Sequence, residues 1–63
     1  MINDNKIAEY MMWSEVLFEC REHNDESAEE YCLDILDTCW WDMNEQERGV
    51  ANIKIYNLYS DRL

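Results

Sequence analysis

Three cysteines and one histidine are the side chains of this 63-residue chain best suited to bind zinc or to form a nucleophile–base pair. Cys20 and His23 lie about one helical turn apart, and Cys32 and Cys39 could complete the four ligands that a structural zinc ion takes. Cys32 and Cys39 are, however, two turns apart, about 10 Å along a helix axis, which is too far for one ion. We therefore interpret Cys32 and Cys39 as reduced core thiols and predict no metal and no cofactor.

The residue pattern does not support a catalytic site either. A Cys20–His23 pair lacks a third group to orient the imidazole, and neighbouring carboxylates would raise the pKa of the thiol rather than lower it. Carboxylates are numerous, but nothing in the sequence indicates which of them is desolvated enough to transfer a proton. We predict that the protein is not an enzyme, and we interpret His23 as a helix-end residue favoured by the negative pole of the helix.

The strongest pattern in the chain is a run of carboxylates without bases. Ten Asp and Glu residues lie between Arg21 and Arg48, with no Lys or Arg among them. Five of the ten fall in Ser27–Met43, where an ordinary solvated helix would intersperse both signs. The net charge of −10 arises entirely from residues 1–43, because residues 44–63 carry equal numbers of acids and bases. This excess is larger than solubility requires and predicts a partner for the acidic part.

A helix over Ser27–Met43 places Glu30, Asp34 and Asp37 in a row on the side opposite to its apolar residues. Carboxylates one turn apart are separated by about 6 Å along the axis, a spacing comparable with that of successive phosphates along a nucleic-acid strand. The row therefore predicts imitation of nucleic acid, with the basic groove of a nucleic-acid-binding protein as the partner. The alternative is that this face is acidic only because it is solvated.

The adjacent pair Trp40 and Trp41 bears on the same question. Neighbours on a helix point about 100° apart, so the two rings cannot enter one core stripe. Trp40 joins Leu33 at the margin of the apolar face, whereas Trp41 falls on the acidic side. Trp41 either covers the turn into the next helix or acts as an interface hot spot for an incoming arginine. The predicted partner-binding set is Glu30, Asp34, Asp37, Trp41 and Asp42.

The elements that must position these residues are helices. Apolar residues make up 48% of the chain and recur at helical spacing, and there is no Pro and only one Gly. The sequence predicts a single all-α domain spanning residues 1–63, a compact three-helix domain with helices at roughly 5–23, 27–42 and 45–62.

Capping residues mark where these helices begin. Three polar residues can cap the first helix: Asn3, Asp4 or Asn5. Ser27 with Glu30, and Asn44 with Glu47, have the spacing of capping boxes. We therefore expect the second helix to begin after Ser27 and the third after Asn44.

The faces that pack inward follow from the apolar spacing. In the first helix they comprise Ile7, Tyr10, Met11, Ser14, Leu17 and Phe18. In the second they comprise Ala28, Tyr31, Cys32, Ile35, Leu36, Cys39 and Met43.

The third helix is apolar on two sides, which predicts that it is buried on both. The side expected to pack inward comprises Ala51, Ile55, Leu58 and Tyr59. The other comprises Val50, Ile53 and Tyr56, which we predict to form the self-interface of a homodimer. A strand over residues 53–55 is the alternative, although the chain offers no second strand for it to pair with.

Other classes of partner and location are excluded by composition. No stretch has the length of uncharged apolar residues that a membrane span needs, and five basic residues are too few for direct binding of nucleic acid. The first ten residues, MINDNKIAEY, have neither a basic leader nor an apolar run. We expect a cytoplasmic protein that binds neither membrane nor nucleic acid.

These patterns together predict a small acidic protein that acts by stoichiometric protein–protein interaction. The leading hypothesis is a DNA-mimic inhibitor from a phage or mobile element, acting in the host cell cytoplasm to evade host defence. Its target would be a CRISPR effector, as for an anti-CRISPR protein, or a restriction enzyme or polymerase. The alternative is a homo-oligomeric adaptor or structural protein whose acidic face is merely solvating.

Overall fold

The computed structural model describes residues 1–60, which form three α-helices and no strand. The helices are α1 (Asp4–Glu22), α2 (Glu26–Asp42) and α3 (Glu45–Tyr59). The predicted all-α, three-helix domain is thereby confirmed, while the last residues of the predicted third helix, 61 and 62, lie outside the described residues. No helix within residues 1–60 is long and apolar enough to cross a membrane.

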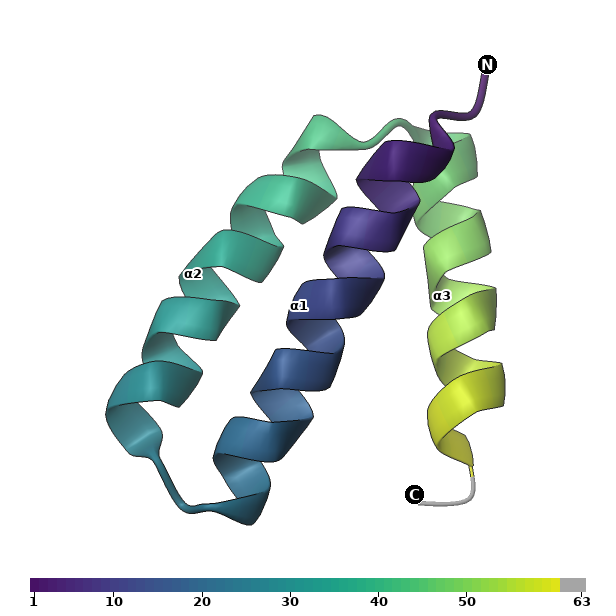
Figure 1. Cartoon of the computed structure of the whole chain (residues 1–63). Coiled ribbons are helices and arrows are strands. Elements are labelled where there is room, and N and C mark those ends of the chain that lie inside the picture. The colour runs from purple at the N-terminus through teal and green to yellow at the C-terminus, as the bar shows by residue number, and fades with distance from the viewer. Residues whose placement is uncertain (61–63) are drawn as a thin grey trace.

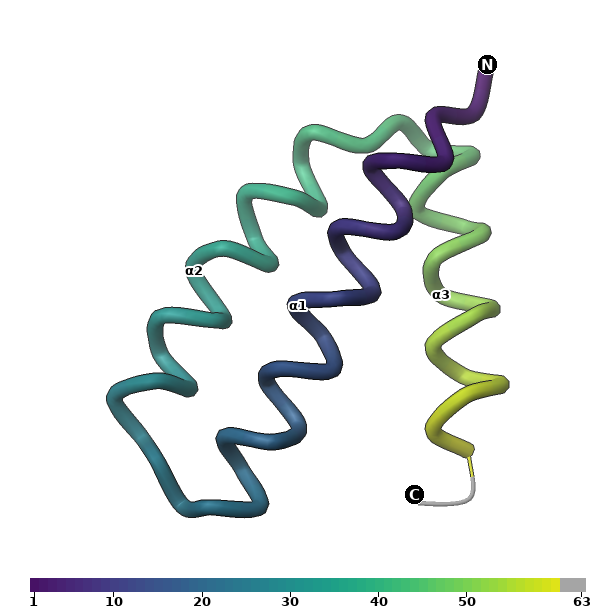
Figure 2. The backbone as a smooth tube through the Cα atoms, viewed as in Figure 1, coloured from purple at the N-terminus to yellow at the C-terminus, as the bar shows by residue number. Residues whose placement is uncertain are grey.

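The three helices lie side by side with α1 in the middle. Figure 1 shows α2 on one side of α1 and α3 on the other, and the backbone trace in Figure 2 shows the same order. α1 packs against both neighbours, whereas α2 and α3 make little contact with each other. The Cα atoms extend over 37 × 25 × 14 Å. The domain is therefore a slab about α1 rather than three helices around a shared axis.

Each helix begins at an Asn or Asp side chain that accepts a hydrogen bond from a backbone N–H. Asn3 caps α1 by accepting from Asn5. The Asn44–Glu47 capping box at the start of α3 is present as predicted, with both of its hydrogen bonds formed.

The predicted start of the second helix at Ser27 is wrong. The cap of α2 is Asp25, whose carboxylate accepts from the N–H of Ala28 at 3.2 Å. Asn24 ends α1 with a positive φ of 56°, and the N–H of Asp25 donates to the carbonyl of Cys20. Because Asp caps a helix as well as Ser does, the first such residue after this tight turn takes the role and Ser27 lies inside the helix.

α1 and α2 are joined by an apolar cluster midway along their length. Leu17 of α1 packs with Cys32 and Leu36 of α2, and all three are buried. Half-buried side chains surround them: Tyr10, Trp13, Val16 and Cys20. Tyr31 was expected on this inward face, but it is 64% exposed and meets the ring of Trp13 edge-on, with ring centroids 6.3 Å apart. It lies one position beside Cys32, on the flank of the contact with α1.

α1 and α3 are joined near the beginning of both helices. Ile7 packs with Met43, which follows α2, and with Ala51 of α3, whose exposed fraction is 0%. Farther along, Phe18 stacks on Tyr59 with ring centroids 4.2 Å apart.

Within one copy, α3 is buried on one side only. Leu58 was expected to pack inward beside Ala51, yet it is 60% exposed. α3 has a helix on one side only, since α2 lies beyond α1, and Ile53 and Tyr56 are exposed as well.

Candidate functional site

The predicted acidic row is exposed on the surface of α2. Glu30, Asp34 and Asp37 are all exposed, and α2 contains six carboxylates and no Lys or Arg. Within residues 1–60, the only α2 carboxylates in ion pairs are Glu29, which accepts from Arg21 at 3.0 Å, and Asp42. The carboxylates of the row therefore face solvent without a basic neighbour in the described part of the chain. Their mutual repulsion is not offset locally.

Asp42 differs from the row because it has a basic neighbour. Its carboxylate lies 3.6 Å from the ammonium of Lys6, which also donates to the carbonyl oxygen of Asp42 at 3.1 Å. The link joins the end of α2 to the first turn of α1. Asp42 is thus brought together with the N-terminal junction rather than with Glu30 and Asp34.

Trp41 lies on the acidic side of α2, as predicted, and is 67% exposed. Its indole N–H donates to the carboxylate of Asp37 at 3.2 Å. The guanidinium of Arg48 lies 4.9 Å from the centre of the Trp41 ring and donates to the backbone carbonyl of Trp40 at 2.9 Å. Trp41 is therefore held at the turn into α3 by two residues of its own chain, while most of its surface remains open.

Arg48 is the residue of this region that sequence reasoning missed. It also lies over the ring of Trp40, at 5.7 Å. The available signal was its position as the first base after the ten carboxylates, seven residues beyond Trp41. An arginine that close to two tryptophans is placed to stack on them once α3 folds back. The cation–π partner expected from outside is thus supplied from within the chain.

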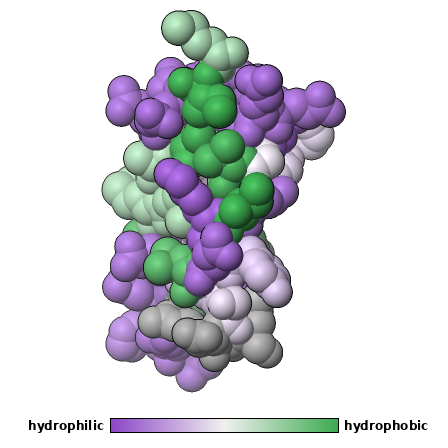
Figure 3. Space-filling model, turned by 90° about the vertical axis from the view of Figure 1, so that its right-hand side faces the viewer, coloured by the Kyte–Doolittle hydropathy of each residue, from purple (hydrophilic) through white to green (hydrophobic). Residues whose placement is uncertain are grey.

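The three residues of the predicted self-interface are separated by the fold. Val50 is half-buried and packs against the cluster of Ile7, Met43 and Ala51, whereas Ile53 and Tyr56 are exposed. In the view onto the α3 side, Figure 3 shows hydrophobic atoms in a column with hydrophilic atoms on both sides. The exposed apolar residues of α3 are Ile53, Tyr56 and Leu58.

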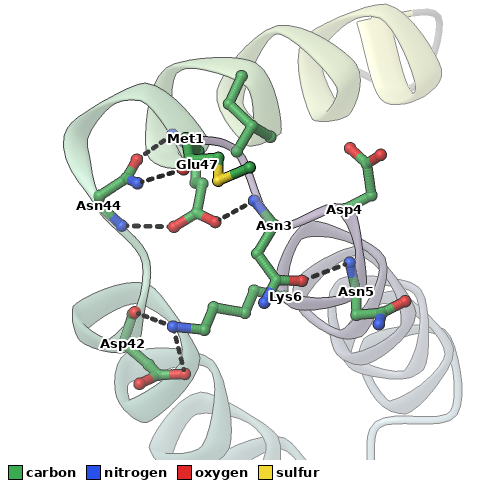
Figure 4. A pocket seen from close by; sticks show the side chains of 9 residues that line it. Met1, Asn3, Asp4, Asn5, Lys6, Asp42, Asn44 and Glu47 are labelled. Carbon is green, nitrogen blue, oxygen red and sulfur yellow. Dashed lines mark hydrogen bonds and ion pairs between the residues drawn. The ribbon is translucent and has the colours of Figure 1, made fainter.

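Glu47 is the one carboxylate buried among residues 1–60, with 2% of its surface exposed. Figure 4 shows its two oxygens between Asn3 and Asn44, whose backbone N–H groups donate to them. These two hydrogen bonds, helped by the nearby charge of Lys6, lower the pKa of Glu47. A carboxylate held ionised in this way cannot act as a general acid, so its role is to tie the start of α1 to the start of α3.

The cysteines are grouped differently from a metal site. The thiols of Cys20 and Cys32 lie close together between α1 and α2, and burial followed by the hydrogen bond between them raises the pKa of Cys20. Burial also raises the pKa of Cys39, with Glu9 and Asp42 adding to it. Within residues 1–60, no three His, Cys, Asp or Glu side chains gather in an arrangement able to hold a metal ion.

Comparison with known proteins adds nothing to this site, because no family model, curated protein or solved structure matches the chain.

Proposed function

We propose that the protein acts by stoichiometric binding, as an inhibitor that occupies the basic groove of a nucleic-acid-binding protein. The observation that carries the proposal is the row of Glu30, Asp34 and Asp37, exposed on a helix that has no base of its own. Intervals of four and three residues separate these carboxylates by about 6 and about 4.5 Å along the axis. A groove lined with Lys and Arg to contact phosphates can bind such a row in the same way.

The distribution of charge supports the same function. Residues 1–43 carry the whole net charge of −10, so the potential around α1 and α2 is strongly negative. A field of one sign speeds the encounter with a basic surface and also repels nucleic acid itself. Trp41 is fixed beside Asp37 and remains largely exposed although Arg48 lies over its ring, so it offers the target an aromatic surface next to the row.

The class of target follows from the chemistry of the row. Proteins with long basic grooves for duplex or heteroduplex nucleic acid include CRISPR effectors, restriction enzymes and polymerases. An inhibitor of such proteins benefits a phage or mobile element, and we propose that origin, with the host cytoplasm as the place of action.

The proposal is tested by displacement of DNA. A fluorescein-labelled duplex is bound to one CRISPR effector, one restriction enzyme and one DNA polymerase, and the protein is titrated in at low and at high salt. We expect displacement from at least one of them, weakening as salt rises. In the triple variant Glu30→Gln, Asp34→Asn, Asp37→Asn, displacement should weaken by about tenfold or more and depend less on salt.

A matched control removes the same charge from another helix. Glu9→Gln, Glu15→Gln, Glu19→Gln changes three exposed carboxylates of α1 and brings the chain to the same net charge. If this variant loses as much activity as the α2 variant, net charge alone is responsible and the row is not the binding site. If the unaltered protein displaces DNA from none of the three, the proposal fails for these target classes.

A second candidate function rests on the exposed apolar residues of α3. We propose as the alternative that Ile53, Tyr56 and Leu58 form a contact between two copies, making the protein a homo-oligomeric adaptor. Self-association through α3 keeps the acidic helices of the two copies apart. Sedimentation equilibrium tests it: a dimer that salt strengthens and Ile53→Glu abolishes supports it, whereas a monomer at micromolar concentration excludes it.

A further inference from the structure

An apolar groove runs between α2 and α3, with α1 as its floor. Leu17 and Phe18 of α1 line the floor, Leu33, Leu36 and Trp40 line the α2 wall, and Ile55 lines the α3 wall. Its volume is about 380 Å³, and it is open along its length rather than enclosed. The groove exists because α2 and α3 diverge from the turn that joins them and barely touch (Figure 1).

The radius of gyration and the accessible surface are both larger than is typical for a domain of this length. The radius of gyration is 11.8 Å, compared with about 10.6 Å for a typical domain of 63 residues. The accessible surface is 4809 Å², compared with about 4,300 Å² for a typical folded monomer of 7.7 kDa. The molecule thus exposes more surface than a chain of this length usually leaves in water.

The α2 wall of the groove changes from apolar to acidic at its outer edge. Asp37 lines the groove itself. Leu33 lines both the groove and a neighbouring shallow hollow, whose other walls include Glu26, Glu29 and Glu30. A side chain that lies on Leu33 is therefore within reach of carboxylates. The edge of the groove and the acidic row belong to one continuous surface.

We propose that this groove binds a basic amphipathic helix of the partner protein. Three helices with an apolar groove between two of them leave the place that a fourth helix takes in a bundle. An amphipathic helix laid there buries its apolar face on Leu33, Trp40 and Ile55. Lys or Arg at the margin of that face would meet Asp37 and Glu30. A helix from a second copy fits less well, because α1 and α2 are acidic and α3 carries as many acids as bases, so none of them is a basic helix.

This inference builds on the proposed function, since both assign a basic partner to α2, and it names the element of the partner that is held. Apolar burial in the groove adds affinity that salt does not remove, because this burial is insensitive to electrostatic screening.

The probe is a synthetic peptide of about 18 Leu and Lys residues, about 27 Å of helix, with leucines at positions i, i+3, i+4 and i+7. A control peptide has the same composition in scrambled order and no apolar face. Binding is followed by calorimetry and by tryptophan fluorescence, which should change because Trp40 lies in the groove wall. We expect one patterned peptide per chain, bound about tenfold or more tightly than the scrambled peptide at high salt.

Two variants locate the binding site. Leu33→Ser alters a partly exposed residue of the groove wall, and Met12→Ser alters an exposed residue of α1 that does not line the groove. Circular dichroism confirms that both fold. We expect Leu33→Ser to weaken binding of the patterned peptide by about tenfold and Met12→Ser to leave it unchanged. Equal loss in both variants, or equal binding of the two peptides by the unaltered protein, would overturn the inference.

The outcomes also separate this inference from the proposed function. A protein that displaces DNA from its target but does not prefer the patterned peptide lacks the groove site and retains the inhibitory function. A protein that binds the patterned peptide in the groove but displaces DNA from no target has the groove site without that function. Self-association that the peptide competes away would place a second copy in the groove and would contradict the basic helix as its occupant.

Discussion

The two helices that flank α1 are attached to it by different means. α2 contributes Cys32 and Leu36 to a buried apolar cluster with Leu17. α3 contributes Ala51, which is small, and is tied at its first turn by Glu47, which accepts from the backbone of Asn3 and Asn44. The first attachment depends on an apolar cluster midway along the helices, whereas the second combines close approach and hydrogen bonds at the start of α3 with the stacking of Phe18 on Tyr59 at its end.

This difference has an energetic consequence. α1 packs more extensively against α2 than against α3. Burial of apolar area stabilises by about 25 cal/mol per Å², so the more extensive interface contributes more. The acid-rich helices α1 and α2 are therefore the pair with the larger apolar contact, which opposes their mutual repulsion. α3, with no excess charge and three exposed apolar residues, is the helix expected to open first.

Breaking the α1–α2 cluster should have the largest effect. Leu36→Ala removes a buried side chain and should cost about 2–5 kcal/mol. A domain of 63 residues has about 3–9 kcal/mol in total, so the variant should lose about half of its stability and unfold at a much lower urea concentration. Urea denaturation followed by circular dichroism measures this, with Leu33→Ala, a partly exposed neighbour on the same helix, as the control. A midpoint close to that of the unaltered protein would show that this cluster is not the main source of stability.

Overpacking the α1–α3 contact should have a smaller and more local effect. Ala51 has no exposed surface, so Ala51→Leu forces the two backbones apart and should cost about 1–3 kcal/mol. Amide hydrogen exchange should accelerate throughout α3 while α1 and α2 keep most of their protection. Asn52→Leu, at an exposed neighbouring position, is the control. Equal acceleration in all three helices would mean that the two interfaces unfold as one unit.

Loss of the Glu47 charge should weaken α3 in a pH-dependent manner. The pKa of Glu47 is lower in the folded protein because two backbone N–H groups donate to its carboxylate. Its stabilising contribution is therefore complete above the unfolded pKa of about 4.3 and is lost as pH falls through the folded pKa. Glu47→Gln should lower Tm at pH 7, by less than Ala51→Leu does, and the difference from the unaltered protein should shrink below about pH 4. A difference that is constant with pH would assign the effect to packing alone.

Local patterns predicted much of this fold. The Asn44–Glu47 capping box and the inward face of α1 are confirmed because they depend on residues within one or two turns of each other. The predicted cap of α2 failed because two capping residues, Asp25 and Ser27, were both available. Only the position of the tight turn at Asn24 selects the first.

The periodicity of apolar residues could not predict how the helices are arranged around α1. Leu58 and Tyr31 belong to apolar faces in the sequence, but burial requires a neighbouring helix, and α2 and α3 do not cover each other. The same holds for the site: the acidic row was predicted from spacing, whereas the contact of Arg48 with Trp41 depends on how α3 folds back. The groove between α2 and α3 likewise has no signature in any single helix.

Stabilising α3 without adding a contact should have the smallest effect, and it tests whether α3 opens separately from α1 and α2. Gly49 lies in the interior of α3, is exposed, and has no heavy atom within 4 Å of the position that a Cβ would take. Gly49→Ala should therefore stabilise the helix by about 0.5–1 kcal/mol, because the unfolded chain loses freedom and nothing clashes. If α3 opens separately from α1 and α2, exchange protection should rise in α3 while the urea midpoint of the whole domain changes little. If the three helices unfold together, the midpoint rises by the full amount, and Gly49→Ser, with its lower helix propensity, should give a smaller increase in the same direction.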